Sequence, residues 1–341
     1  MTKKESLPQG FLTRPATMDD LENTVNLINY FTNHYIGHNE TSIPNLRRDW
    51  ETPGFKLEND TCLVINPQGE FVGYQEVWTI NNPPVHPYIW GCVHPHFESM
   101  GIGSYLLTWG EKRAHQELSR VSQDLRVAIW ADTDDRIEPA KRLLEEHGLY
   151  PIRYALRMMI EMSAPPPKPD FPKDIFLRSY NPKRDAKAVY QADNDAFRDH
   201  FGFIEESFED GFPKFIHYFT NDETYDPTLW FIATSGDEIA GICLCNKWSN
   251  DDRDAGYIAS LGVRRPWRKK GLGMALLNHA FGEFYRRGKR KVSLDVDAEN
   301  LTGALRLYKK VGMRVSRKFV RYEKELRPGK EISVQSLDET P

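Results

Sequence analysis

The residues best placed to do chemistry form one short run, Arg268-Lys269-Lys270-Gly271-Leu272-Gly273, between an apolar strand-like segment and an apolar helix-like segment. Glycines permit a tight turn and let a ligand approach the main chain. A helix that begins there presents unpaired N–H groups and the positive end of its dipole, which suit a diphosphate. The motif alone is equally compatible with a plain strand-to-helix turn.

Two familiar phosphate-binding motifs do not fit this run. A dinucleotide fingerprint needs a third glycine three residues after Gly273, where Leu276 stands. A P-loop needs Gly-Lys-Ser/Thr, which is absent here. The cations at 268–270 would then lie beside a diphosphate that the turn itself binds.

Composition sets wider limits. A chain of 341 residues suggests about two domains, and 40% hydrophobic with 28% charged residues is typical of a globular protein. The formal net charge of −4 gives no reason to expect nucleic acid or a membrane surface as partner. The N-terminus does not resemble a signal peptide, and no run is long enough to span a membrane. We therefore expect a cytoplasmic protein.

The cysteines also argue against a metal site. None forms a Cys-x-x-Cys pair, and no histidine cluster accompanies them. Their apolar surroundings favour free, buried thiols. The four cysteines are Cys62, Cys92, Cys243 and Cys245.

An internal repeat organises the chain. Val93, Gly101 and Gly103 recur 170 positions later in the same order. Five prolines within 163–172 read as a stiff linker between the copies. The domains expected are an N-terminal copy over 1–162, a linker over 163–173, a catalytic copy over 174–327 and a flexible tail over 328–341. The repeated landmarks are Val263, Gly271 and Gly273.

Each copy is expected to contain an opening strand, a helix, a hairpin, a fourth strand, the glycine turn, a long helix, a fifth strand and a closing helix. Alternating strands and helices around a mixed sheet place the fold in the α/β or α+β class. The strands expected in the second copy are 175–179, 229–234, 238–245, 257–263 and 291–296, and its long helix is 274–287.

The run 268–273 resembles the acetyl-CoA-binding signature Arg/Gln-x-x-Gly-x-Gly/Ala of the GNAT superfamily of N-acetyltransferases. Further along, Asn300, Ala304, Tyr308 and Gly312 resemble the second signature of that superfamily, although Ala304 lies four residues after Asn300 where three is usual. The resemblance implies two tandem GNAT folds, in an arrangement similar to the mycothiol synthase type. It also implies acetyl-CoA as co-substrate and no metal.

The same resemblance implies roles for single residues. The main chain of Leu261, Gly262 and Val263 would hold the pantetheine arm like an added strand, and Asn300 would help to fix it. The loop of Arg268, Lys269, Lys270, Gly271, Leu272 and Gly273 would hold the diphosphate. Tyr308 would return a proton to the departing CoA thiolate, after direct attack by a small-molecule amine in a ternary complex. An alternative for Tyr308 is a helix tyrosine packed in the core.

The general base is less well defined by the sequence. Asp295 matches a place where some superfamily members carry a catalytic glutamate. Asp297 shares its side of the strand by period two, and Asp254 precedes the fourth strand. For each of the three, a structural carboxylate is at least as good an interpretation.

The first copy lacks parts of this machinery. Glu98 stands where the second copy has Arg268, and a carboxylate repels a diphosphate. Leu144 stands where the second copy has Tyr308, and leucine cannot donate a proton. We expect a structural, regulatory or passive CoA-binding copy, whose second CoA site would use Val93, Gly101 and Gly103.

An aromatic segment follows the first helix of the second copy. Phe197, His200 and Phe201 are candidates for the acceptor site, and Phe208 and Phe212 continue the segment. Packing against the first copy is an equally good alternative. The function alternatives are a non-catalytic acyl-CoA sensor, another acyl-CoA, or a peptide amine. Either a monomer with an internal pseudo-dimer or a homodimer fits the duplication.

Overall fold

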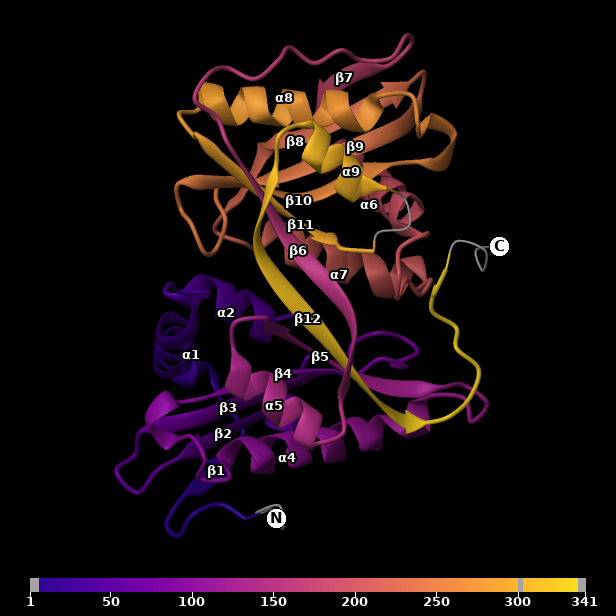
Figure 1. The fold of residues 1–341 in the computed structure, drawn as a ribbon. Helices are drawn as coiled ribbons and strands as arrows, with labels where there is room; N and C mark the ends of the chain where they lie inside the picture. The colour runs from indigo at the N-terminus through magenta and orange to yellow at the C-terminus, as the bar shows by residue number, and fades with distance from the viewer. Residues whose placement is uncertain (1–5, 300–302, 337–341) are drawn as a thin grey trace. The chain divides into compact units, whose positions relative to one another are not determined.

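The computed structural model describes residues 6–299 and 303–336, and these form two compact units. Unit 1 contains residues 6–153 and 319–332, and unit 2 contains 154–299, 303–318 and 333–336. Within each unit the strands form a mixed sheet that has helices on both faces (Figure 1). This confirms the expected mixed α/β class.

The sheet of unit 1 runs in the order β1-β2-β3-β4-β5-β12. Its neighbours are antiparallel except for β4 and β5, which are parallel. The strands are β1 (Leu12–Arg14), β2 (Thr61–Ile65), β3 (Phe71–Trp78), β4 (Tyr88–Val93), β5 (Val127–Asp134) and β12 (Arg314–Arg327), and the helices are α1 (Leu21–Ile36), α2 (Ile43–Trp50), α3 (Leu57–Asp60), α4 (Ile102–Gln116) and α5 (Glu138–Glu146).

The sheet of unit 2 runs in the order β6-β11-β10-β9-β8-β7, with β10 and β11 parallel and the other pairs antiparallel. The strands are β6 (Tyr150–Glu161), β7 (Phe176–Ser179), β8 (Tyr225–Ser235), β9 (Glu238–Asn246), β10 (Ala255–Val263) and β11 (Lys291–Asp297), and the helices are α6 (Pro182–Phe197), α7 (Phe208–Thr220), α8 (Leu272–Arg286) and α9 (Ala304–Lys310).

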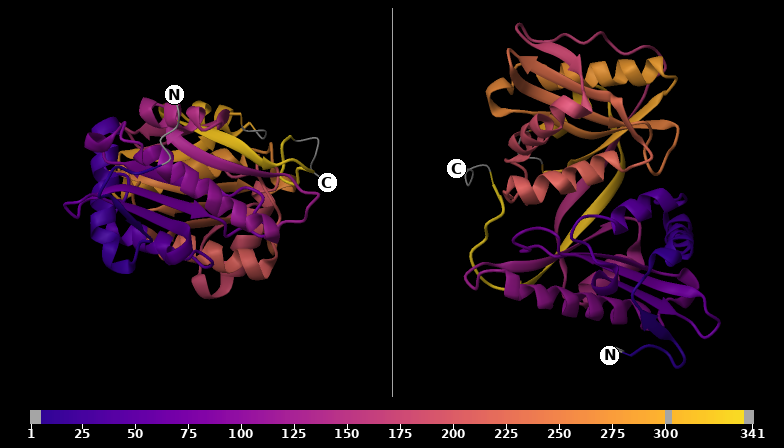
Figure 2. Two further views of the ribbon diagram at one scale, coloured as in Figure 1. Left: turned by 90° about the horizontal axis from the view of Figure 1, so that it is seen from below. Right: turned by 180° about the vertical axis from the view of Figure 1, so that it is seen from behind.

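Alternation along β9 explains the two layers of unit 2. Cys243 and Cys245 belong to the apolar cluster beneath α8 and α9, whereas Ile242 and Leu244 belong to the cluster beneath α6 and α7. Successive strand residues point to opposite faces, so an apolar run can supply both cores. Helices α8 and α9 lie in front of the sheet in Figure 1, and α6 and α7 lie in front after the half-turn shown in Figure 2.

The two halves of the chain exchange their last strands. β12, from the second half, pairs with β5 of unit 1, for example at Tyr322 and Ala131. β6, from the first half, pairs with β11 of unit 2, for example at Met158 and Leu294. The compact units therefore differ from the expected domains 1–162 and 174–327, because each half completes the sheet of the other.

The described part of the expected tail is also bonded. The main chain of Lys330 forms a parallel bridge with Leu125 in unit 1. In unit 2, the N–H of Gly202 donates to the carbonyl of Val334 at 2.8 Å, and the N–H of Val334 donates to Phe203 at 3.1 Å. Residues 328–336 thus differ from the loose segment expected from composition.

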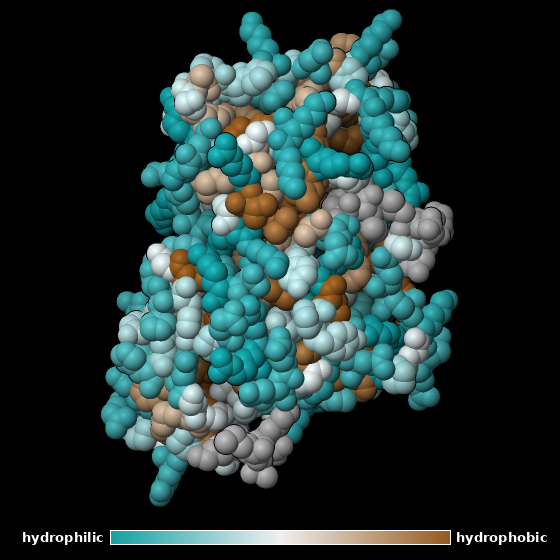
Figure 3. Space-filling view, in the orientation of Figure 1, coloured by the Kyte–Doolittle hydropathy of each residue, from teal (hydrophilic) through white to brown (hydrophobic). Residues whose placement is uncertain are grey.

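The remaining bulk expectations concern thiols and membranes. All four cysteines are buried and free, as expected. Among the described residues, no helix is both long and apolar enough to cross a membrane. The face drawn in Figure 3 is covered mainly by hydrophilic side chains.

Candidate active site

The parallel strands β10 and β11 separate along their length. They pair only from Ala255 with Lys291 to Tyr257 with Ser293. An irregularity between Ile258 and Ser260 follows, while β10 continues to pair with β9 as far as Val263. The stretch 258–263 therefore has no strand partner on its β11 side among the described residues. We call this separation of β10 from β11 the split, and the unpaired side of 258–263 the free edge of β10. An extended amide ligand can add there as a further strand.

The glycine loop lies at the end of that stretch. Helix α8 begins at Leu272, and its N-cap Gly271 has φ of 87° and no capping side chain. The first N–H groups of α8 are consequently left for a ligand. Gly273 faces Leu307, since an added Cβ would lie 3.0 Å from its Cδ2. This close approach brings the start of α8 against α9, which carries Tyr308.

The Arg268 guanidinium is bonded to groups around the glycine loop instead of extending into solvent. Its Nε donates to the Val263 carbonyl at 2.9 Å and its Nη2 donates to the Ala196 carbonyl at 3.1 Å. Its Nη1 also pairs with Asp199, which binds Arg265 as well. These arginines hold the pKa of the Asp199 carboxyl down, to about 2, against the effect of burial. One carboxylate thus pairs with two arginines, and Arg268 also binds main-chain carbonyls beside the loop.

The two lysines of the loop differ from each other. Lys270 donates to the Pro266 carbonyl at 2.9 Å. Lys269 is exposed, has φ of 60°, and has no hydrogen-bond or ion-pair partner in the described part of the chain. Of the three cations at 268–270, Lys269 is the one whose side chain has no bonded partner among the described residues.

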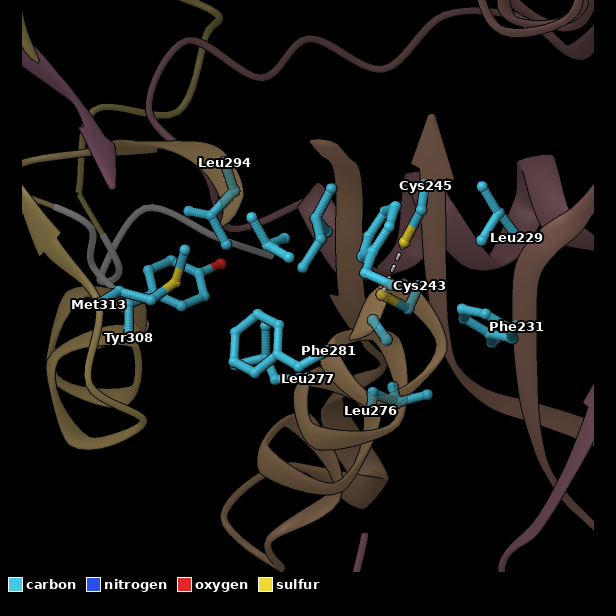
Figure 4. Close-up of a cluster of buried hydrophobic side chains, with 14 of the residues drawn as sticks. Leu229, Phe231, Cys243, Cys245, Leu276, Leu277, Phe281, Leu294, Tyr308 and Met313 are labelled. Atoms are coloured by element: carbon cyan, nitrogen blue, oxygen red, sulfur yellow. Dashed lines mark hydrogen bonds between the residues drawn. The ribbon is translucent and has the colours of Figure 1, made fainter. Parts of the chain in front are cut away.

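Tyr308 lies deep in the apolar cluster beneath α8 and α9, with only 6% of its surface exposed. The cluster also contains Leu294 and Val296 of β11, and Leu261 and Val263 of β10 pack against it. The hydroxyl points into the middle of the cluster (Figure 4). Burial is the main cause that raises the pKa of the Tyr308 phenol above its ordinary value, and the nearby Cys243 acts in the same direction. The group therefore stays protonated and able to donate.

Asp295 is engaged in an ion pair. Arg157 of β6 binds both of its carboxylate oxygens at 2.8 Å, and the Tyr257 hydroxyl donates to it at 3.0 Å. To accept a proton, the carboxylate would have to give up these bonds. Asp297 accepts the N–H of Glu299 at 3.0 Å, and Asp254 is exposed. The geometry favours a structural role for Asp295.

The expected acceptor residues divide into two groups. The Phe197 ring lies beside β10, because a Cβ on Gly262 would be 3.6 Å from it, and it packs on His200 with ring centroids 4.4 Å apart. Burial lowers the pKa of His200. Phe201 is partly buried in the same turn region. Phe208 and Phe212 instead pack on Tyr190 at the edge of the α6–α7 core.

Comparison with known proteins decides the family. A model described as the acetyltransferase (GNAT) family matches the chain twice, over residues 26–149 and 186–313. The chain belongs to the GNAT acetyltransferase family. The two matches agree with the repeat in the sequence, and the protein is an acyltransferase from a family that uses acyl-CoA as co-substrate.

Several relatives resemble this acetyltransferase over most of its length. The mycothiol acetyltransferase of Thermobispora bispora is 30% identical over 227 residues, which are 64% of this chain and 70% of that protein. The mycothiol acetyltransferase of Saccharomonospora viridis is 28% identical over 289 residues, 82% of this chain and 89% of that protein. A crystal structure of a GCN5-related N-acetyltransferase from Sphaerobacter thermophilus is 35% identical, with a TM-score of 0.78, and covers 97% of this chain and 100% of that one.

The first copy of the acetyltransferase keeps the shape of the glycine loop. Gly101 has φ of 88° and Ser99 has φ of 59°, close to the values at Gly271 and Lys269. A Cβ on Gly103 would approach Leu143 to 2.7 Å, as Gly273 approaches Leu307. Val93 ends β4, which pairs with β5 only at Tyr88 and Ile89. Unit 1 therefore has both the separation of β4 from β5 and the glycine turn, but it has Glu98 in place of a cation and Leu144 in place of a phenol.

Two aspartates beside strand β10 and the glycine loop were not predicted from the sequence. Asp199 anchors the loop arginines, and Asp193 accepts a hydrogen bond from the Ser260 hydroxyl at 2.6 Å. Their partners lie more than sixty residues away, so no local spacing signals either pair. Asn300 lies outside the described residues.

Proposed function

We propose that unit 2 of this acetyltransferase moves an acetyl group from acetyl-CoA to a primary amine of a small molecule, by direct attack in a ternary complex. The observation that carries the proposal is the buried phenol of Tyr308 in the same cluster as both strands of the split. A ligand thioester added along the free edge of β10 would lie beside that cluster. The names of the relatives, mycothiol acetyltransferases, support acetyl as the group transferred.

The free edge and the loop supply the two halves of a CoA site. The main chain of Leu261 and Val263, on either side of Gly262, offers strand-type hydrogen bonds to the amides of the pantetheine arm. The N–H groups from Lys269 to Gly273 offer donors to the diphosphate, with Lys269 as the available side-chain cation. Asn300 is expected to help fix the arm, by resemblance to the superfamily signature.

The chemistry then follows from the groups present. The amine nitrogen attacks the acetyl carbonyl carbon, so that a C–N bond forms and negative charge develops on the oxygen. A main-chain N–H near Val263 would stabilise that oxyanion. As the C–S bond breaks, the electron pair leaves with sulfur and Tyr308 donates its proton to the thiolate. The phenol regains a proton from the nitrogen, which sheds it on becoming an amide.

Substitution of Tyr308 by Phe tests the proposal. We expect turnover to fall by about 100-fold or more, with little change in KM for acetyl-CoA, because only proton donation is lost. Release of CoA thiol, followed with a panel of small primary amines, measures this. The matched control is Tyr180→Phe, which removes another buried phenol hydroxyl of unit 2 from the opposite core.

The alternatives predict different results in the same assay. A non-catalytic acyl-CoA sensor would bind acetyl-CoA but release no thiol with any amine of the panel. Preference for a longer acyl-CoA or for a peptide amine would change the substrate and leave the effect of Tyr308→Phe in place. Equal turnover by the Tyr308→Phe and wild-type proteins across the pH range would remove Tyr308 from the mechanism.

A further inference from the structure

One carboxylate on α6 has no counter-ion. The helix carries three aspartates, of which Asp185 pairs with Arg178 and Asp195 pairs with Arg264. Asp193 has no cationic partner in the described part of the chain, and its bonded neighbour is the hydroxyl of Ser260. The ion pairs that attach α6 to the sheet therefore do not need this acid.

The position of Asp193 places it over the split. Ser260 directly precedes Leu261, whose main chain belongs to the free edge of β10. Two residues further along β10, Gly262 lies against Ala196 of α6, because a Cβ added to Gly262 would lie 2.8 Å from the Ala196 Cβ. Asp193 thus lies on the α6 face of the split, whereas Tyr308 belongs to the core on the α8 and α9 face.

No charged side chain pairs with Asp193 in the described part of the chain, so burial is the main influence on the pKa of its carboxyl. Ser260 faces it from β10, and Tyr190 lies one turn earlier on α6. On the α7 side, Glu206 and Lys214 pair with each other at 2.6 Å. Burial raises the pKa of the Asp193 carboxyl to about 6, and the hydrogen bond from Ser260 acts in the opposite direction. Such a carboxylate is ionised at neutral pH and still able to take up a proton.

We propose that Asp193 is the base that removes the proton from the acceptor ammonium, with Ser260 as its positioning residue. One N–H bond of the ammonium breaks, an O–H bond forms on the carboxylate, and the free amine attacks the thioester. The proton returns to solvent after the products leave. The inference rests on the proposed function and adds a residue to it. In unit 1, the strand position of Ser260 is occupied by Trp90, consistent with an inactive copy.

Three variants test the assignment in the full chain. For Asp193→Asn we expect kcat/KM for the amine to fall about 100-fold or more at pH 7, and the rise of kcat/KM with pH near 6 to disappear. For Ser260→Ala the rise should move to higher pH, because the bond that lowers the pKa is lost. Asp195→Asn, from the same helix, should leave both the rate and the pH profile unchanged. Calorimetric titration with acetyl-CoA confirms that each variant is folded and binds.

The outcomes separate this inference from the proposed function. If wild-type protein acetylates an amine and Asp193→Asn keeps both the rate and the rise near pH 6, the role of Asp193 is overturned and the proposed function stands. A rate loss with an unchanged pH profile would also overturn it, since that result means a structural effect. If the wild-type protein acetylates no amine, the proposed function fails and this inference fails with it.

Discussion

Asp199 organises the glycine loop without belonging to it. It is 1% exposed, directly follows the end region of α6, and pairs with Arg265 and Arg268. The sequence motif indicated the loop and Tyr308, because both are local patterns of glycine, cation and tyrosine. It did not indicate Asp193 or Asp199, because an aspartate with a distant partner looks like any other aspartate on a polar helix face.

Replacement of Asp199 by Asn is predicted to loosen the loop. We expect KM for acetyl-CoA to rise about tenfold with kcat little changed, since the chemical groups stay in place. The carboxyl has a folded pKa of about 2 against 3.8, so its contribution of about 2 kcal/mol is complete above about pH 4 and is lost as pH falls through 2. Unfolding by denaturant at pH 7 and pH 3 checks this. A constant stability difference between the two pH values would contradict it.

The elements of the fold were predicted unevenly. The hairpins, the fourth strands and the long helices have strong alternation or helical spacing, and the structure places them within a few residues of the expected positions. The closing strands β6 and β12 were not expected. Their partners belong to the other half of the chain, so no pattern within one repeat can specify them. The same limit explains why the expected domain boundaries differ from the compact units.

The glycine turns of the two copies give a matched pair of variants. At Gly271, an added Cβ meets nothing within 4 Å, so alanine is disfavoured only by the positive φ, at about 1–2 kcal/mol. We expect Gly271→Ala to raise KM for acetyl-CoA about tenfold. Gly101→Ala has the same φ cost and should leave KM unchanged if unit 1 takes no part in turnover. Steady-state kinetics and thermal unfolding of both variants test this, and an equal rise in KM would refute it.

At the scale of the whole molecule, Glu323 attaches the exchanged strand β12 to unit 1. It accepts hydrogen bonds from Arg126 at 2.6 Å, from the Trp130 indole at 2.9 Å and from the Tyr150 hydroxyl at 3.1 Å. Burial opposes its charge, but these donors outweigh burial, so the pKa of Glu323 is lowered. The carboxylate therefore stabilises unit 1 above the unfolded-state pKa, and that stability is lost as pH falls through the folded value.

We expect Glu323→Gln to lower the free energy of unfolding by about 1–3 kcal/mol at pH 7, and by less in acid. The matched control is Glu325→Gln, which pairs with the same Arg126 but is 44% exposed, and should change stability by less than about 1 kcal/mol. Urea denaturation monitored by tryptophan fluorescence measures both. An equal loss in the free energy of unfolding from the two substitutions would show that burial of Glu323 does not increase its contribution.

The strand exchange has a consequence for the order in which the protein matures. The edge of β5 is made before unit 2, but residues 319–327, which pair with it, are synthesised only after residues 154–318. The sheet of unit 1 therefore has an open edge at β5 until residues 319–327 have been synthesised. A ribosome-bound chain that stops before residue 319 therefore has β5 as an unpaired edge strand. Unpaired edge strands tend to associate with strands of other nascent chains.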